Sequence, residues 1–141
     1  MTRVVWVTGA GKGLGRQVSL QLAEAGWRVA ATSRTAEDLN SLAADAQHFV
    51  GSVHPFQADI IDRDAIDGLV EKIEDEIGPL DLAILNAGTY LRFGLEDFSA
   101  KRFAHQMEIN VNGTVNCLSP VLKRMRNRRR GQIAVVSSLS A

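Results

Sequence analysis

Short apolar runs alternate along this chain with longer segments in which apolar residues recur every three or four positions. The runs are typical of buried β-strands, and the recurring pattern is typical of amphipathic helices. We expect strands at residues 4–7, 27–33, 54–58, 80–85 and 131–138. We expect helices at residues 13–25, 39–46, 62–77 and 99–126. This alternation predicts a single α/β domain across residues 1–141, built on a parallel sheet.

The first apolar run ends in a glycine-rich turn that contains Gly9, Gly11, Gly13 and Gly15. Glycines let a backbone approach an anion closely, and the N-terminus of the following helix favours a phosphate group. A magnesium-dependent mononucleotide loop is not expected, because Lys12 is followed by Gly13 rather than by Ser or Thr. The turn therefore favours a dinucleotide site, and a turn without any ligand is the alternative.

Residues 8–15 read Thr-Gly-Ala-Gly-Lys-Gly-Leu-Gly and resemble the Thr-Gly-x-x-x-Gly-x-Gly fingerprint of the short-chain dehydrogenase/reductase family. Three later segments, around Asn86, Asn110 and Ser138, are similar to that family as well. The resemblance implies a Rossmann-like, doubly wound parallel sheet of strand order 3-2-1-4-5, as far as the fifth strand, with the cofactor at the carboxyl ends. It also implies an oxidoreductase that transfers a hydride between a nicotinamide dinucleotide and a small carbonyl or alcohol substrate.

The end of the second strand indicates which nicotinamide cofactor binds. In a dinucleotide fold a carboxylate at that place binds the ribose 2′-hydroxyl, whereas a basic residue accommodates a 2′-phosphate. Here the place is taken by Ser33 and Arg34, with no acid before Glu37, and Lys12 supplies a second cation from the glycine turn. This pattern resembles family members that use NADP(H), so we expect NADP(H) to be preferred over NAD(H). The alternative is that both cations are merely solvated.

The residues expected to contact the cofactor come from four separate places in the sequence. They are Gly9, Gly11, Lys12, Gly13, Leu14, Gly15, Ser33, Arg34, Asp59, Ile60, Asn86, Ala87 and Gly88. By the resemblance Asp59 borders the adenine, although it or Asp62 could instead cap the next helix. Residues 86–88 resemble the family's Asn-Asn-Ala-Gly element, with Leu85 in place of the first Asn. The amide of Asn86 is expected to tie adjacent strands together.

The resemblance also assigns two residues to the reaction. Ser138 would orient the substrate carbonyl, and Asn110, within the helix at residues 99–126, would join a proton relay and perturb the helix locally. The family's Tyr-x-x-x-Lys pair is not among these 141 residues, and the single tyrosine, Tyr90, has Gly94 four residues later. We therefore expect the cofactor-binding part of such an enzyme, inactive by itself. The alternative is a non-catalytic nucleotide-binding or assembly module derived from the family.

Charge and composition narrow the choice of partners. The 16 basic and 16 acidic side chains cancel, so no overall charge favours nucleic acid or an anionic membrane. Residues 123–130 include six basic residues but no aromatic residue, and we interpret them as a solvated helix end rather than a nucleic-acid site. No apolar run approaches roughly 18 residues and no leader is evident, which we interpret as a cytoplasmic protein. The histidines show no metal-ligand spacing, so no metal is expected.

The apolar positions also predict which surfaces are buried. The helix at residues 62–77 should bury Ile66, Leu69, Val70, Ile73 and Ile77. The long helix should bury Phe103, Met107, Val111, Leu118, Leu122 and Met125. It should bend or restart at Pro120, and Cys117 should be a packed thiol. Residues 133–136 form an apolar strand that needs cover on both faces. We therefore expect a homo-oligomer formed through this strand or through the long helix around Asn110, or else a poorly soluble chain.

Overall fold

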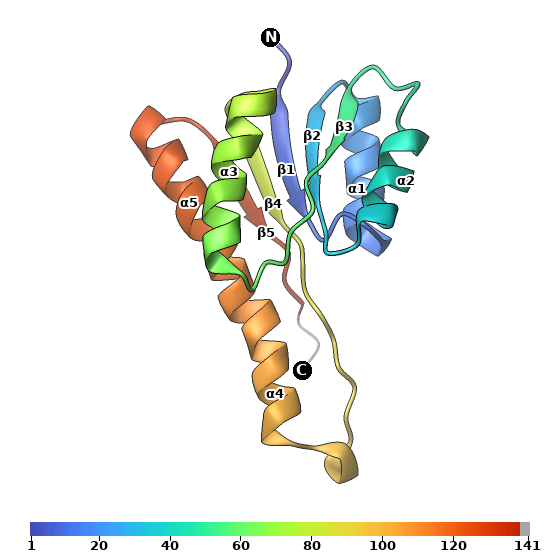
Figure 1. The fold of residues 1–141 in the computed structure, drawn as a ribbon, viewed down its shortest axis with the longest axis vertical. Helices are drawn as coiled ribbons and strands as arrows, with labels where there is room; N and C mark the ends of the chain where they lie inside the picture. The colour runs from blue at the N-terminus through green and yellow to red at the C-terminus, as the bar shows by residue number, and fades with distance from the viewer. Residues whose placement is uncertain (139–141) are drawn as a thin grey trace.

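The computed structural model describes residues 1–138, which form five parallel strands flanked by helices (Figure 1). The strands are β1 (Val4–Thr8), β2 (Arg28–Thr32), β3 (Ser52–Pro55), β4 (Leu82–Leu85) and β5 (Gln132–Val135). The helices are α1 (Gly13–Glu24), α2 (Ala36–Asp45), α3 (Arg63–Ile77), η1 (Leu95–Asp97), α4 (Ala100–Met107), η2 (Glu108–Gly113) and α5 (Thr114–Arg128). The spatial order β3-β2-β1-β4-β5 confirms the predicted doubly wound α/β sheet.

The central strands β1 and β2 are buried on both faces, and alternate residues of each strand pack in opposite layers. Val5 lies beside Val29 in the register of β1 and β2, and both pack in the cluster that includes α1 and α2. Trp6 lies beside Ala30 and packs in the cluster that includes α3 and α5. The fully buried indole of Trp6 donates its N–H to the hydroxyl of Thr32 at 2.9 Å. Burial on both faces explains why the central strands read as almost continuous apolar runs.

The third strand is displaced from its predicted position. β3 begins at Ser52 and ends at Pro55 rather than at Ala58. Proline is accommodated because β3 is an edge strand, where one missing N–H costs little. Backbone pairing with β2 nevertheless continues past the strand, since the N–H of Phe56 donates to the carbonyl of Ala31 at 2.8 Å. The chain therefore stays paired with β2 past the end of the strand, toward the carboxyl edge of the sheet.

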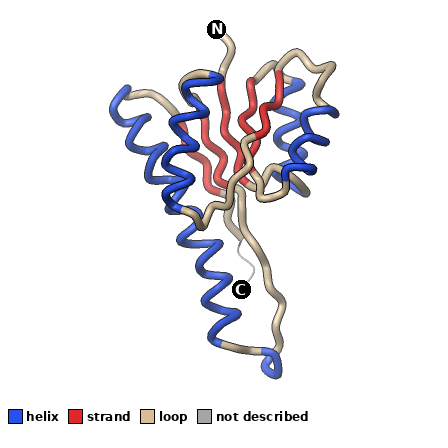
Figure 2. Tube along the Cα trace, viewed as in Figure 1, coloured by secondary structure: helices blue, strands red, loops and turns tan. Residues whose placement is uncertain are grey.

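The helix predicted at residues 99–126 is one long rod that extends beyond the end of the sheet (Figures 1 and 2). Its predicted local perturbation is present as the π-helical turn η2, which contains Asn110. The helix does not restart at Pro120, which lies inside α5. Among residues 1–138 no helix has the length and apolar character needed to span a bilayer.

The predicted buried face of this rod is wrong over most of its length. The residues that it buries are Gly113, Cys117, Val121 and Met125. Of the residues expected there, Phe103, Met107, Val111 and Leu122 are exposed and Leu118 is only partly buried. Ile60 approaches this face so closely that glycine is needed at position 113, since a Cβ added to Gly113 would lie 2.6 Å from Cδ1 of Ile60. The free end of the rod extends past the sheet, so no strand lies beside it there (Figure 1).

The single cysteine is a core residue, as predicted. Cys117 lies on the buried face of α5 among the apolar residues that also contact α3. Burial raises the pKa of its thiol to about 12, so the side chain stays protonated at neutral pH. A protonated, enclosed thiol packs as a small apolar group and is a poor nucleophile.

The basic residues at the end of α5 do more than face solvent. Arg128 donates to the carboxylate of Glu74 on α3 at 2.8 Å, and Arg130 donates to the carboxylate of Asp81 at 2.7 Å. Glu74 is almost enclosed and also accepts the backbone N–H of Leu80 at 3.0 Å. Part of the basic run therefore joins α5 to α3 and to the start of β4, in addition to forming the predicted solvated helix end.

Candidate functional site

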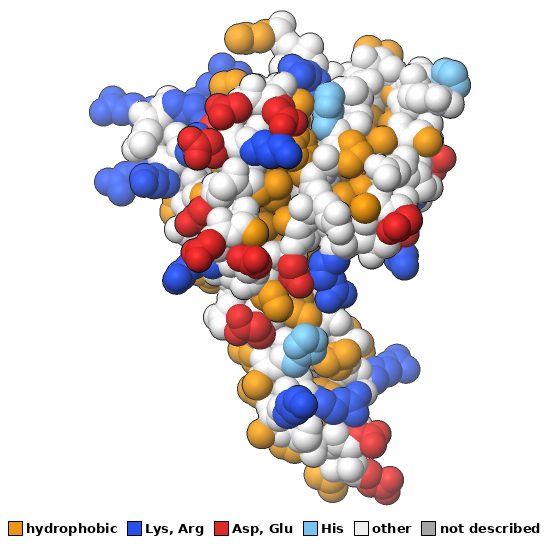
Figure 3. All heavy atoms as spheres, in the orientation of Figure 1, with side chains coloured by type: hydrophobic (Ala, Val, Ile, Leu, Met, Phe, Trp, Pro, Cys, Tyr) orange, Lys and Arg blue, Asp and Glu red, His pale blue; other side chains and the backbone are white. Residues whose placement is uncertain are grey.

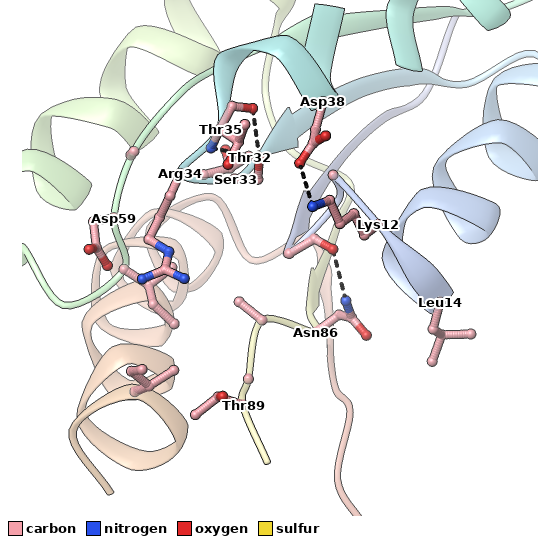
Figure 4. Close-up of a pocket in the computed structure, with 17 residues that line it drawn as sticks. Lys12, Leu14, Thr32, Ser33, Arg34, Thr35, Asp38, Asp59, Asn86 and Thr89 are labelled. Atoms are coloured by element: carbon pink, nitrogen blue, oxygen red, sulfur yellow. Dashed lines mark hydrogen bonds and ion pairs between the residues drawn. The ribbon is translucent and has the colours of Figure 1, made fainter. Parts of the chain in front are cut away.

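A cleft of about 480 Å³ opens at the carboxyl ends of β1, β2 and β4 (Figure 4). It lies beside the switch point between β1 and β4, where open α/β sheets bind ligands. The predicted cofactor-contacting residues come together here, except Gly13 and Gly15, which are not among the described lining residues. Lining residues that the sequence reasoning did not name are Thr32, Thr35, Asp38, Ala58, Thr89 and Ile109.

The glycines of the turn are needed for backbone shape and close packing. Gly9 and Gly13 have φ angles of 65° and 55°, a region that L side chains rarely adopt. A Cβ on Gly15 would collide with the carbonyl oxygen of Gly9, and one on Gly11 would lie 3.0 Å from Oγ of Ser33. Within residues 1–138 no side chain caps the N-terminus of α1, so its first-turn N–H groups are available to an anion.

A set of hydrogen bonds joins the end of β1 to the end of β4. The hydroxyl of Thr8 accepts the backbone N–H groups of Asn86 at 3.0 Å and Ala87 at 3.1 Å. The Asn86 amide donates to the carbonyls of Thr8 and Gly9 at 3.2 and 3.3 Å, which confirms that it ties adjacent strands. Thr8 is 1% exposed, and its role was not evident from the sequence beyond its place in the fingerprint.

Two cations reach the cleft from different elements. Figure 4 shows the side chain of Arg34, just past β2, directed toward Asp59, and that of Lys12 directed toward Asp38. Within residues 1–138 the Arg34 guanidinium makes no ion pair or hydrogen bond. The backbone carbonyl of Arg34 accepts a hydrogen bond from the side-chain amide of Gln57 at 2.8 Å. Nζ of Lys12 lies 3.6 Å from Oδ2 of Asp38. The two cations are thus unequally available to a ligand.

Asp59 and Ile60 lie in the cleft, and a different residue caps α3. Asp62 is the N-cap, since its side chain accepts the N–H of Ala65 at 3.0 Å. Asp59 accepts the N–H of Ile61 at 3.2 Å and lines the cleft beside Ile60. Of the two capping alternatives, the structure thus selects Asp62, which leaves the carboxylate of Asp59 facing the cleft.

Asn110 anchors the segment that follows β4. Its Oδ1 accepts the N–H of Thr89 and its Nδ2 donates to the carbonyl of Thr89, both at 2.7 Å. A Cβ on Gly88 would lie 3.2 Å from the same Oδ1, so glycine allows this close approach. Ser138 lies three residues past the end of β5 and is exposed. Neither Asn110 nor Ser138 is among the described residues that line the cleft.

The cleft is polar but not strongly charged. Its described lining carries two cations, Lys12 and Arg34, and two carboxylates, Asp38 and Asp59. Residues 1–138 hold no cluster of His, Cys, Asp and Glu side chains placed to bind a metal ion. The arrangement can therefore bind a polar, phosphate-bearing molecule through backbone N–H groups and a small number of positive side chains.

Comparison with known proteins gives consistent matches across the chain. The family described as short chain dehydrogenase matches residues 3–141. An oxidoreductase of Myxococcus xanthus is 36% identical over 98% of this chain and 54% of its own length. A 3-oxoacyl-[acyl-carrier-protein] reductase of Thermotoga maritima is 32% identical over 97% of this chain and 56% of its own length.

The structure of NAD⁺-bound xylitol dehydrogenase superposes on this chain with a TM-score of 0.93 at 28% identity, covering 98% of this chain and 54% of that one. This chain therefore spans about half the length of the proteins it matches.

The Thr8 hydroxyl should account for much of the stability of the junction between β1 and β4. Thr8→Val keeps the shape but leaves the N–H groups of Asn86 and Ala87 without their acceptor, which should lower the free energy of unfolding by about 2 kcal/mol or more. Thr8→Ser keeps the hydroxyl and loses one methyl group, at about 1 kcal/mol. Urea denaturation measures both variants, and equal stability of the two would contradict this assignment.

Proposed function

Because this chain belongs to the short-chain dehydrogenase family, we propose that it forms the cofactor-binding part of an NADP(H)-dependent oxidoreductase. The reaction is a hydride transfer to or from a small carbonyl or alcohol substrate. The observation that carries the proposal is the cleft at the β1–β4 switch point, where the glycine turn and the N-terminus of α1 lie near the guanidinium of Arg34, which makes no ion pair with any residue in 1–138.

The residues of the cleft fit a dinucleotide along its length. The N–H groups of α1 and the glycine turn suit a pyrophosphate. Ser33 and Arg34 suit a 2′-phosphate at the end of β2, because a guanidinium forms strong, charge-assisted hydrogen bonds with phosphate. Asp59 and Ile60 suit the border of an adenine. The volume of about 480 Å³ is in the range of sites for small ligands.

When bound, the nicotinamide supplies or accepts the hydride, and the protein orients the reacting groups. Asn110 holds the segment at Thr89, next to the cleft, and would join the proton relay from there. Ser138 would orient the substrate carbonyl by hydrogen bonding. Neither side chain is a general acid of suitable pKa, so both would assist a proton transfer that another group carries out.

A second function is a nucleotide-binding or assembly module without catalysis. It would use the same cleft and the same anion-binding turn. Tyr90 does not replace the tyrosine of the family's Tyr-x-x-x-Lys pair, because it is exposed in the segment after β4 and lacks a lysine four residues later. The two functions share the nucleotide site and differ in whether a longer chain supplies the proton donor.

Arg34 should determine the cofactor preference. Charge-assisted hydrogen bonds contribute about 1.5–3 kcal/mol each, so Arg34→Ala should weaken NADP⁺ binding about tenfold or more and leave NAD⁺ binding nearly unchanged. Isothermal titration of both cofactors measures this, with Arg126→Ala, at an exposed position on α5, as the control for lost charge. Equal affinities of the unsubstituted chain for the two cofactors would refute the preference.

The 141 residues alone should not reduce a carbonyl substrate. A general acid or base typically contributes about 10²- to 10⁴-fold in rate, and the residues present supply no such group at Ser138 or Asn110. The purified chain, mixed with NADPH and a panel of ketones and aldehydes, should lose nicotinamide absorbance no faster than a protein-free control. Turnover that disappears in Ser138→Ala would show that another proton donor completes the site.

The chain should associate with itself through apolar surface. Val135 and Val136 at the sheet edge are exposed, and so are Val111, Val115 and Leu122 on the rod formed by α4, η2 and α5. Burying such surface contributes about 25 cal/mol per Å². Sedimentation velocity should therefore detect dimers or larger species at micromolar concentration, and a stable monomer over that range would rule out this association.

A further inference from the structure

Asp38 is one of the two carboxylates that line the cleft, and it lies beside the glycine turn. Asp38 is in the first turn of α2, and its Oδ2 lies 3.6 Å from Nζ of Lys12 (Figure 4). The Lys12 side chain is 83% exposed and that of Asp38 is 27% exposed. The sequence does not single out Asp38, because an acid in the first turn of a helix is ordinary. The fold brings it to the glycine turn.

The position of Asp38 is fixed by its backbone. Arg16 on α1 donates through Nη1 to the carbonyl of Asp38 at 3.2 Å and to that of Gly11 at 3.5 Å. Its Nη2 also pairs with the carboxylate of Asp45 at the far end of α2. A Cβ on Gly11 would lie 3.1 Å from Cβ of Asp38, so the turn and α2 are in close contact. The backbone and Cβ of Asp38 are therefore held close to the glycine turn, whereas the largely exposed end of Lys12 can move.

This arrangement makes the two cations different. Lys12 already has an anionic partner, and Arg34 makes no ion pair within residues 1–138. A phosphate entering beside Ser33 would have to draw the Lys12 ammonium away from Asp38.

We propose that Asp38 is a specificity-determining residue that limits the preference for a 2′-phosphate by competing with it for Lys12. The inference rests on the proposed nucleotide site and adds an opposing group to it. Arg34 attracts the 2′-phosphate, while Asp38 competes with that phosphate for the ammonium of Lys12. The preference for NADP(H) over NAD(H) is therefore weaker than two fully available cations would give. Removing the Asp38 charge therefore strengthens binding selectively for the ligand that carries the 2′-phosphate.

The chain offers a matched control one residue away. Glu37 lies in the same first turn of α2, but it is exposed and is not among the described residues of the cleft. Glu37→Gln and Asp38→Asn remove the same charge from the same helix end. Any general effect of net charge or of the helix dipole should appear in both variants, and only the competition for Lys12 should be specific to Asp38.

The ligands adenosine 2′,5′-bisphosphate and adenosine 5′-monophosphate isolate the adenosine end of the site. Isothermal titration of the 141-residue chain should give about three- to tenfold tighter binding of the bisphosphate to Asp38→Asn, with the monophosphate changed less than about twofold. Glu37→Gln should change both ligands by less than about twofold. Asp38→Ser is a second variant, and circular dichroism verifies that each variant is folded.

A double-mutant cycle tests the role of Lys12. In a Lys12→Met background, Asp38→Asn should lose most of its gain for the bisphosphate, because no ammonium remains to be released. The proposal is overturned if Asp38→Asn behaves like Glu37→Gln, if its full gain persists without Lys12, or if it mainly weakens the monophosphate. An unsubstituted chain that binds neither ligand would overturn the proposed function as well, whereas binding without a response at Asp38 overturns only this inference.

Discussion

The cleft depends on one junction, where the backbones beyond β1 and β4 run in direct contact. A Cβ on Gly9 would lie 2.8 Å from the Cα of Ala87, so a side chain at this point would force the two segments apart. The buried hydroxyl of Thr8 holds them together by accepting the N–H groups of Asn86 and Ala87. Because Gly15 packs against the carbonyl of Gly9, the same junction also sets where α1 begins and where its N–H groups point.

A second constraint holds the backbone where the cleft meets α2, while a charged side chain there can still move. Arg16 bonds the carbonyls of both Gly11 and Asp38, so it joins the glycine turn to α2 without occupying the cleft. The ammonium of Lys12, in contrast, is largely exposed. Ligand choice at such a place depends on the few side chains that surround it, while the backbone geometry changes little between variants.

The sequence predicts the features that local chemistry determines. The apolar runs locate the strands to within a few residues, and the glycine spacing locates the turn at the switch point. The prediction of the buried face of the long rod was wrong. That face depends on how closely Ile60 approaches Gly113, which hydrophobic periodicity does not encode. Asp38 was missed for a similar reason, since only the packing of α2 against the glycine turn brings its carboxylate to Lys12.

The two ends of the molecule, at the cleft and at the segment between β4 and α4, differ in the internal contacts that hold them. At the cleft, strands, glycine turn and α2 are joined by partly buried hydrogen bonds and by close packing. At the other end, the segment between β4 and α4 is tied to the rod by a few bonds, such as Asn110 to Thr89 and Gln106 to the N–H of Leu91. Exposed apolar residues such as Val111 lie on the same rod. The cleft is therefore held by contacts among the described residues, whereas apolar side chains of the rod stay exposed to solvent within residues 1–138.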